Sequence, residues 1–401
     1  MKKRTVLLCL FHGLVMSAVL PTRGGGEEVP NGMETPQILD EFDIAKGGDL
    51  ILVPVTIADK PYPFVLATNR DRTFVDIRLR HLLGNPLSTG DGNGPLAHWQ
   101  EFTPVPMKIG KTAFTAARAL QCSDIARPLR EVSGHDVYGE VGLDFLRDRV
   151  VQIDFDNGKL RVFAPDAVIP NPRGWVAHRM AGENVDQFPA VIQKVVGYGW
   201  SGFMIDTSWT GPIAVGSHEM TSLVKDGAII ELGTTMMDTY DGRRMARRGG
   251  RMRGLTALDC PPVPNLVAVD LGCSCVGLDY LSRFQLTLDF KRREVYLIPG
   301  AKFYEPVQDQ WSGLNLALKN GVVTVIDVLA QSPADGVGIR ALDVLVEVDQ
   351  RPVSEYSLFQ IRKLLSRPVN HTVTLRRGER DVSVRLQASV ANGCDEASEA
   401  P

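Results

Sequence analysis

Two short stretches of the sequence, 203–208 and 64–69, carry residue types suited to acid–base chemistry. The first ends in a carboxylate, a hydroxyl and a small residue, Asp206, Thr207 and Ser208. The second has the same apolar frame but ends in Ala67, Thr68 and Asn69. A carboxylate at a strand end can take up and deliver a proton during catalysis. The first stretch therefore holds a candidate catalytic group, Asp206, and its counterpart has Ala67 at the same place.

An internal duplication explains why the two stretches match. The hairpin predicted over 150–163, with an Asn-Gly turn, has a near copy over 286–300. Four residue pairs repeat at a spacing of 135 positions: Gly142 and Gly277, Leu143 and Leu278, Asp154 and Asp289, Phe155 and Phe290. Phe64 and Phe203 stand 139 positions apart, so whole units of similar length are repeated.

The repeats predict two lobes, 47–175 and 186–300. Short apolar runs, many Gly and Pro residues and few aromatic residues indicate a mainly β protein. Each unit places its stretch at an equivalent strand end. A pseudo-twofold arrangement of the lobes would therefore bring 64–69 and 203–208 face to face.

The two repeats resemble the two-lobed aspartic peptidases, the pepsin-like and retropepsin-like superfamily. The resemblance rests on an apolar pair before Asp-Thr-Gly/Ser and a later apolar-apolar-Gly segment, both present twice. These segments are Ile205-Asp206-Thr207-Ser208 with Val276-Gly277, and Leu66-Ala67-Thr68-Asn69 with Val141-Gly142. The resemblance covers 47–300 and implies two duplicated β-barrel lobes with a cleft for an extended peptide between them.

In that family two carboxylates share one proton, because two like charges so close together cannot both ionise readily. One carboxylate activates a water molecule, and the other polarises the peptide carbonyl. Each Thr hydroxyl braces the opposing loop. The resemblance implies that Asp206 is the surviving catalytic acid, with Thr207 and Ser208 beside it. The degenerate counterpart is Ala67, Thr68 and Asn69.

Two replacements for the missing acid are weak alternatives. Asp71 and Asp76 follow Ala67 closely, but the strand-end geometry directs them away from the site. A homodimer that pairs two second repeats would supply two acids, but the first repeat is expected to occupy that surface. Asn69 also adds bulk where the family has a small residue. We therefore expect severe loss of peptidase activity.

The C-terminal unit, 308–390, resembles a bacterial-type PDZ domain. In the resemblance, Ser312, Gly313, Leu314, Asn315 and Leu316 form the loop that captures a terminal carboxylate. The strand that follows this loop could then accept a peptide by strand addition. Leu342 and Gln350 stand where the family usually has glycine. A helix is expected from about Leu358 to Leu365, and 391–401 reads as a mobile tail.

The N-terminus predicts export. Residues 1–20 have a basic start and a short apolar core, as a signal peptide does, and an uncleaved anchor is the alternative. Residues 21–46 read as a flexible leader, and no second span of comparable length follows. The net charge of -3 argues against a nucleic-acid binder. A periplasmic, cell-surface or secreted protein is expected.

Other motifs carry weaker signals. Cys273 and Cys275 have no partner motif that would complete a metal site, so neither a metal nor a cofactor is predicted. A bridge from Cys260 to one of them and buried free thiols are both open alternatives. The G-x-G-x-x-G match at 197–202 precedes a strand and reads as a hairpin turn. The arginines within 243–253 suit an acidic ligand or a solvated loop.

The sequence thus predicts an exported pseudopeptidase that binds an extended peptide or a protein C-terminus. The alternative is an active aspartic endopeptidase, in which Asp206 works with an unrecognised or dimer-supplied second carboxylate.

Overall fold

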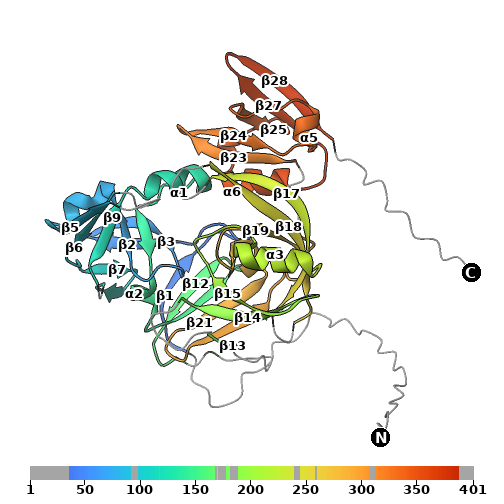
Figure 1. The fold of residues 1–401 in the computed structure, drawn as a ribbon. Helices are drawn as coiled ribbons and strands as arrows, with labels where there is room; N and C mark the ends of the chain where they lie inside the picture. The colour runs from blue at the N-terminus through green and yellow to red at the C-terminus, as the bar shows by residue number, and fades with distance from the viewer. Residues whose placement is uncertain are drawn as a thin grey trace, which may run out of the picture. The chain divides into compact units, whose positions relative to one another are not determined.

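The computed structural model describes most of the chain from residue 36 onward (Figure 1). The described residues are 36–91, 98–116, 118–167, 169, 178–180, 188–238, 244–257, 260–307 and 312–387. The predicted signal peptide, 1–20, and the predicted tail, 391–401, lie outside them. The described chain is mainly β, as expected, and its strands form several sheets.

One six-stranded sheet combines strands from both repeats. Its strands, in spatial order, are β1 (Ile38–Asp43), β12 (Lys159–Phe163), β11 (Val150–Asp154), β21 (Phe284–Asp289), β22 (Glu294–Pro299) and β13 (His178–Arg179). The two predicted hairpins are confirmed as β11–β12 and β21–β22, and β11 pairs antiparallel with β21. Gln152 lies opposite Thr287, its equivalent in the second repeat, and Gln152 Nε2 donates to Thr287 Oγ1 over 3.3 Å. Because equivalent residues face each other, the pseudo-twofold axis of the duplication passes through this pair.

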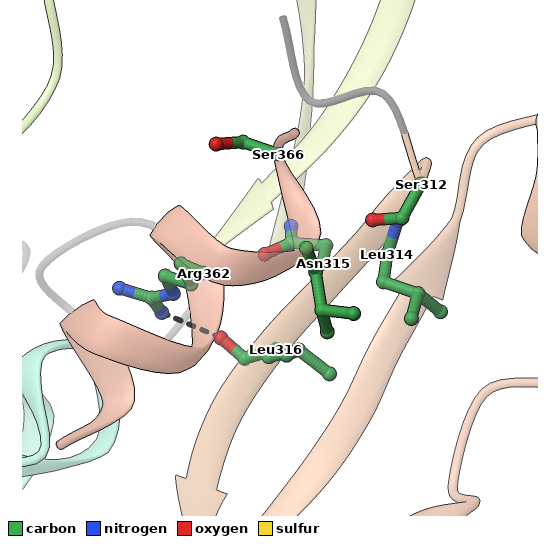
Figure 2. A pocket seen from close by; sticks show the side chains of 7 residues that line it. Ser312, Leu314, Asn315, Leu316, Arg362 and Ser366 are labelled. Carbon is green, nitrogen blue, oxygen red and sulfur yellow. Dashed lines mark hydrogen bonds between the residues drawn. The ribbon is translucent and has the colours of Figure 1, made fainter. Parts of the chain in front are cut away.

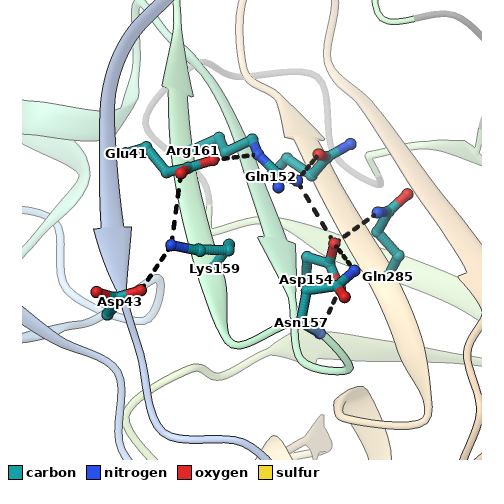
Figure 3. Close-up of polar contacts among 8 residues, drawn as sticks. All are labelled: Glu41, Asp43, Gln152, Asp154, Asn157, Lys159, Arg161 and Gln285. Carbon is teal, nitrogen blue, oxygen red and sulfur yellow. Dashed lines mark hydrogen bonds and ion pairs between the residues drawn. The ribbon is translucent and has the colours of Figure 1, made fainter.

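The predicted flexible leader, 21–46, is wrong over its last part. Residues Ile38–Asp43 form β1 and pair antiparallel with β12. Figure 3 shows ion pairs between these strands: Arg161 with Glu41 and Lys159 with Asp43, each at 2.7 Å, and Lys159 with Glu41 at 3.6 Å. The sequence concealed this strand because its partner lies far along the chain and the pairing depends on charges that also suit a solvated segment.

Each repeat has a second sheet of its own. In the first repeat the order is β5 (Pro86–Asp91), β6 (His98–Phe102), β9 (Leu120–Ser123), β4 (Phe74–Asp76), β10 (Gly139–Val141), β3 (Lys60–Leu66), β2 (Leu52–Ile57), β7 (Met107–Ile109) and β8 (Thr112–Phe114). In the second it is β14 (Ala190–Val195), β15 (Gly199–Ile205), β20 (Cys275–Val276), β16 (Ile213–Val215), β19 (Val263–Asp270), β18 (Arg244–Thr256) and β17 (Ile229–Asp238). The β14–β15 hairpin contains the predicted turn of the G-x-G-x-x-G match.

Short helices join these strands. They are η1 (Ile77–Leu82), α1 (Ala126–Ser133), α2 (Leu143–Leu146), α3 (Ser217–Lys225) and α4 (Leu278–Leu281). One hydrophobic core runs through both repeats, from Leu50 to Phe303. The repeats therefore share their sheet and their core, and they stabilise each other.

The C-terminal unit has a separate hydrophobic core. Its strands are β23 (Leu314–Lys319), β24 (Val322–Val328), β25 (Val344–Val348), β26 (Arg351–Pro352), β27 (His371–Arg377) and β28 (Arg380–Leu386). Its helices are α5 (Pro333–Gly336), η2 (Val353–Glu355) and α6 (Leu358–Leu365). The helix expected at 358–365 is confirmed as α6. Ser357 and Gln360 form a capping box that stabilises its start.

Leu342 and Gln350 have positive φ values of 75° and 65°. A side chain in this left-handed region is strained, and glycine adopts it at the lowest cost. The unit keeps both turns without glycine. In the described part of the chain, no helix is long and apolar enough to cross a membrane.

Candidate functional site

The two strand ends meet through the same backbone scheme. In the first repeat β3 runs parallel to β10, and Ala67 N donates to Val141 O over 2.9 Å. In the second, β15 runs parallel to β20, and Asp206 N donates to Val276 O over 3.0 Å. Positions 67 and 206 therefore occupy equivalent places at the ends of equivalent strands.

The glycines that follow β10 and β20 permit this packing. A Cβ added to Gly142 would collide with the Arg72 carbonyl, and one added to Gly277 would collide with the Gly211 carbonyl. Each glycine thus lets a loop backbone pass close to the strand end. The spacing of the two glycines was a visible sequence signal for this arrangement.

Two buried threonines tie the strand ends together reciprocally. Thr68 Oγ1 donates to Ile205 O over 2.5 Å, and Thr207 Oγ1 donates to Leu66 O over 2.6 Å. Each hydroxyl also accepts from the opposite backbone, at 3.1 Å from Thr207 N and 3.2 Å from Thr68 N. The structure therefore brings the two predicted stretches together, with each Thr hydroxyl bound to the opposing loop.

The side chain that faces Asp206 belongs to Asn69. Asn69 Nδ2 donates to Asp206 Oδ2 over 2.9 Å. The other carboxylate oxygen, Oδ1, accepts from Ser208 N at 2.9 Å and lies 2.8 Å from Ser208 Oγ. Ser208 Oγ is also 3.1 Å from Asn69 Oδ1, so this hydroxyl bridges the pair.

Asn69 was expected to add bulk and polarity at this place, but its bond to Asp206 was not predicted. An asparagine that stands at the repeat position of Ser208 was the signal available. An amide cannot exchange protons as a carboxyl group does, but it can donate to one. Asn69 therefore supplies a neutral partner to Asp206.

Asp206 is only 7% exposed. Burial raises its pKa above the usual range, because a charged carboxylate is poorly solvated there. The hydrogen bonds from Ser208 and the charge of Arg70 oppose this rise, while Glu140 adds to it. Asp206 is thus held as a desolvated carboxyl group.

The sequence analysis also missed the buried carboxylate of Glu140. Its Oε2 lies 2.6 Å from Arg70 Nε, and its side chain is 1% exposed. Glu140 stands on β10, and its counterpart in the second repeat is Cys275. The polar residue in an otherwise apolar segment before Gly142 was the signal for it.

The two carboxylates considered as replacements have other partners. Asp71 pairs with Arg72 at 3.3 Å and with Arg118 at 3.2 Å. Asp76 is buried, binds Arg78 at 2.6 Å and accepts from Ala126 N at the start of α1. Both act in the packing of the first repeat, in line with the expectation that they point away from residue 67.

Four of the five residues predicted to capture a peptide carboxylate, all except Gly313, line a small cavity in the C-terminal unit (Figure 2). It measures about 30 Å³, and its lining residues are Ser312, Leu314, Asn315, Leu316, Arg362, Leu365 and Ser366. Gly313 adopts a positive φ of 72°, and its carbonyl accepts from Leu329 N. A cavity of this size accommodates water but no peptide side chain.

Arg362 of α6 closes the edge of β23. Its Nη2 donates to Leu316 O over 2.5 Å (Figure 2). Burial lowers the pKa of Arg362 to about 10, so the group remains charged at neutral pH. α1 of the first repeat also packs beside β23. A peptide that adds to this strand must first displace the guanidinium group.

The structure also bears on the cysteines, on a metal site and on the arginine cluster. Cys122, Cys260, Cys273 and Cys275 are not in disulfides, so no bridge joins Cys260 to either later cysteine. Among the described residues, no group of three or more His, Cys, Asp or Glu side chains could hold a metal ion. Arg248 pairs with Glu231 at 2.8 Å on an exposed surface, which favours the solvated alternative at that position.

Comparisons with protein-family models and with curated proteins give no match to this chain.

Proposed function

We propose that this protein is an exported, catalytically impaired relative of the aspartic peptidases that binds extended peptides. One observation carries the proposal. Asp206 faces an asparagine amide in a pseudo-symmetric site, where an active pair would have a second carboxyl group.

The chemistry of the site supports impairment. Peptide hydrolysis by this route needs one carboxyl group to accept a proton while another donates one. The side chain of Ala67 has no polar group, and the Asn69 amide is neither an acid nor a base near neutral pH. General acid–base catalysis typically contributes about a hundred- to ten-thousand-fold to rate, so losing one partner is severe.

The backbone of the site supports retained binding. The threonine bonds and the glycine contacts are present on both sides of the pseudo-twofold axis. The segments 85–103 and 236–256 are, by the resemblance, loops that could cover the cleft. The first contains the antiparallel pair β5–β6, and the second contains β18, which pairs antiparallel with β17. Such strands suit an extended peptide, whose backbone can pair with theirs.

A second function, residual acid peptidase activity, has one observation in its favour. The charge of Glu140 acts on Asp206 and raises its pKa, as a second carboxylate would. However, Glu140 is ion-paired with Arg70 at 2.6 Å. Because this carboxylate already binds Arg70, we rank this function second.

Binding is tested with a fluorescently labelled, unfolded polypeptide and the full mature chain. Ser208→Trp places bulk beside Asp206, and Thr221→Trp on the exposed side of α3 is the matched control. We expect wild type and the control to bind, and Ser208→Trp to bind at least about tenfold more weakly, or ~1.4 kcal/mol. Equal binding by all three proteins would show that the peptide does not bind at the strand ends, and it would contradict the proposal.

A further inference from the structure

Two thiols lie on and just before the strand that supports Asp206, β20. Cys275 is buried in β20, where it pairs with Met204 of β15 and with Ala214 of β16. Cys273 is exposed and lies just before this strand, after the Gly272 turn. The pair therefore combines one accessible and one protected thiol in three consecutive residues.

The residue between them is anchored. Ser274 Oγ contacts Glu219 of α3 and accepts from Gly216 N at 3.1 Å. Ser274 O accepts from Met204 N at 3.0 Å. Ser274 is thus held by both its side chain and its carbonyl, and it leaves one cysteine on each side of it in the chain.

The two thiols are hydrogen-bonded to each other. The bond from Cys275 lowers the pKa of Cys273 to about 7, and the same bond, with burial, raises the pKa of Cys275. By contrast, burial raises the pKa of Cys122 to about 12. The thiolate is the reactive form of cysteine, so Cys273 is set apart from a buried structural cysteine.

We propose that Cys273 and Cys275 form a redox-active thiol pair that reacts with low-molecular-weight disulfides. Cys273 attacks and Cys275 resolves. This role is independent of the proposed peptide binding.

The reaction balances in two steps. The Cys273 thiolate attacks one sulfur of the small disulfide, whose S–S bond breaks, and one thiolate leaves. Cys275 then loses its proton and attacks the Cys273 sulfur of the mixed disulfide, and the second small thiol leaves. The protein loses two hydrogens as its cysteines are oxidised, and the small disulfide is reduced to two thiols. A bridge across one residue is strained and therefore easily reduced.

The test uses oxidised glutathione and the full chain. Cys9 and Cys394, which lie outside the described residues, are replaced by serine. Intact mass and native thiol titration are the readouts. We expect the reacted protein to lose two titratable thiols and to carry no glutathione. Cys275→Ser should retain one glutathione, and Cys273→Ser should react at least roughly tenfold more slowly. Cys260→Ser, which removes a separate buried thiol, should behave like the parent.

A stable glutathione adduct on the parent protein would contradict the pair, because Cys275 would then not resolve it. Unchanged reaction of Cys273→Ser would contradict the role of Cys273. Circular dichroism of each variant distinguishes these results from unfolding. If the protein fails to bind peptide but still forms the Cys273–Cys275 disulfide, the result contradicts the proposed function and supports the thiol pair.

Discussion

The two strand ends of this protein differ in their side chains far more than in their backbones. Leu66–Asn69 and Ile205–Ser208 exchange the same threonine bonds, at 2.5 Å and 2.6 Å, and each lies beside an equivalent parallel strand. Only the second carries a carboxylate. The two strand ends therefore keep one backbone scheme with different side-chain chemistry, because the threonines and glycines hold the backbone whichever residue stands at 67 or 206.

The largest effect should come from making the two ends alike. Ala67→Asp combined with Asn69→Gly restores two carboxyl groups and removes the amide from between them. We expect cleavage of unfolded protein at acidic pH to rise by about a hundredfold or more over wild type. Ala67→Asp alone should gain less, because Asn69 still occupies Asp206 Oδ2.

The control for this gain is Asp206→Ala in the double variant, which should abolish it. A gain that survives that change would show that the new activity does not use a carboxylate pair.

The symmetry of the threonine bonds makes a second prediction. Thr68→Val and Thr207→Val each remove one hydroxyl and leave buried backbone groups without a partner. Each orphaned group costs about 1–3 kcal/mol, and the two variants should lose similar stability in urea unfolding. Thr221→Val on the exposed side of α3 should change stability by less than about 0.5 kcal/mol.

Strongly unequal losses of unfolding free energy in Thr68→Val and Thr207→Val would contradict the equivalence of the two strand ends. They would mean that one strand end holds the site together without the other.

These bonds also show how far sequence reasoning reached. The spacing of Gly142 and Gly277 predicted the duplicated hairpins and the meeting of 67–69 with 206–208. It did not predict that Asn69 would turn its amide toward Asp206, because side-chain direction depends on packing across the axis. Nor did it reveal β1, whose ion pairs join residues 120 and 116 positions apart. A sequence repeat thus predicts the backbone arrangement of the two units, but it does not predict individual polar contacts between side chains.

The burial of Asp206 predicts a pH dependence that Ala67 cannot share. Its pKa is raised in the folded protein, so the folded state binds the proton more tightly than the unfolded chain. This contribution to stability is fully present below the unfolded pKa and is lost as pH rises through the folded pKa. Wild type should therefore lose stability relative to Asp206→Asn as pH rises from acidic to neutral values, measured by urea unfolding. A constant difference between the two proteins would indicate that Asp206 titrates normally.

The smallest expected effect lies in the C-terminal unit. Arg362→Met keeps the apolar stem but frees Leu316 O at the edge of β23. Binding of a peptide with a free C-terminal carboxylate should tighten by about tenfold, or ~1.4 kcal/mol, in fluorescence anisotropy. Lys363→Met, which removes a pair with Asp279 at 2.5 Å, is the matched control on the same helix. Equal affinity in wild type and Arg362→Met would mean that the guanidinium group does not close the groove.

The central claim is that Asp206 alone does not make a working peptidase. Purified wild type and Asp206→Ala are incubated with unfolded protein substrates across acidic to neutral pH, and new peptide ends are counted. The account predicts no cleavage above background that depends on Asp206, at any pH in this range. Robust cleavage by wild type that disappears in Asp206→Ala would contradict it, and Glu140→Gln would then test whether Glu140 supplies the second carboxylate.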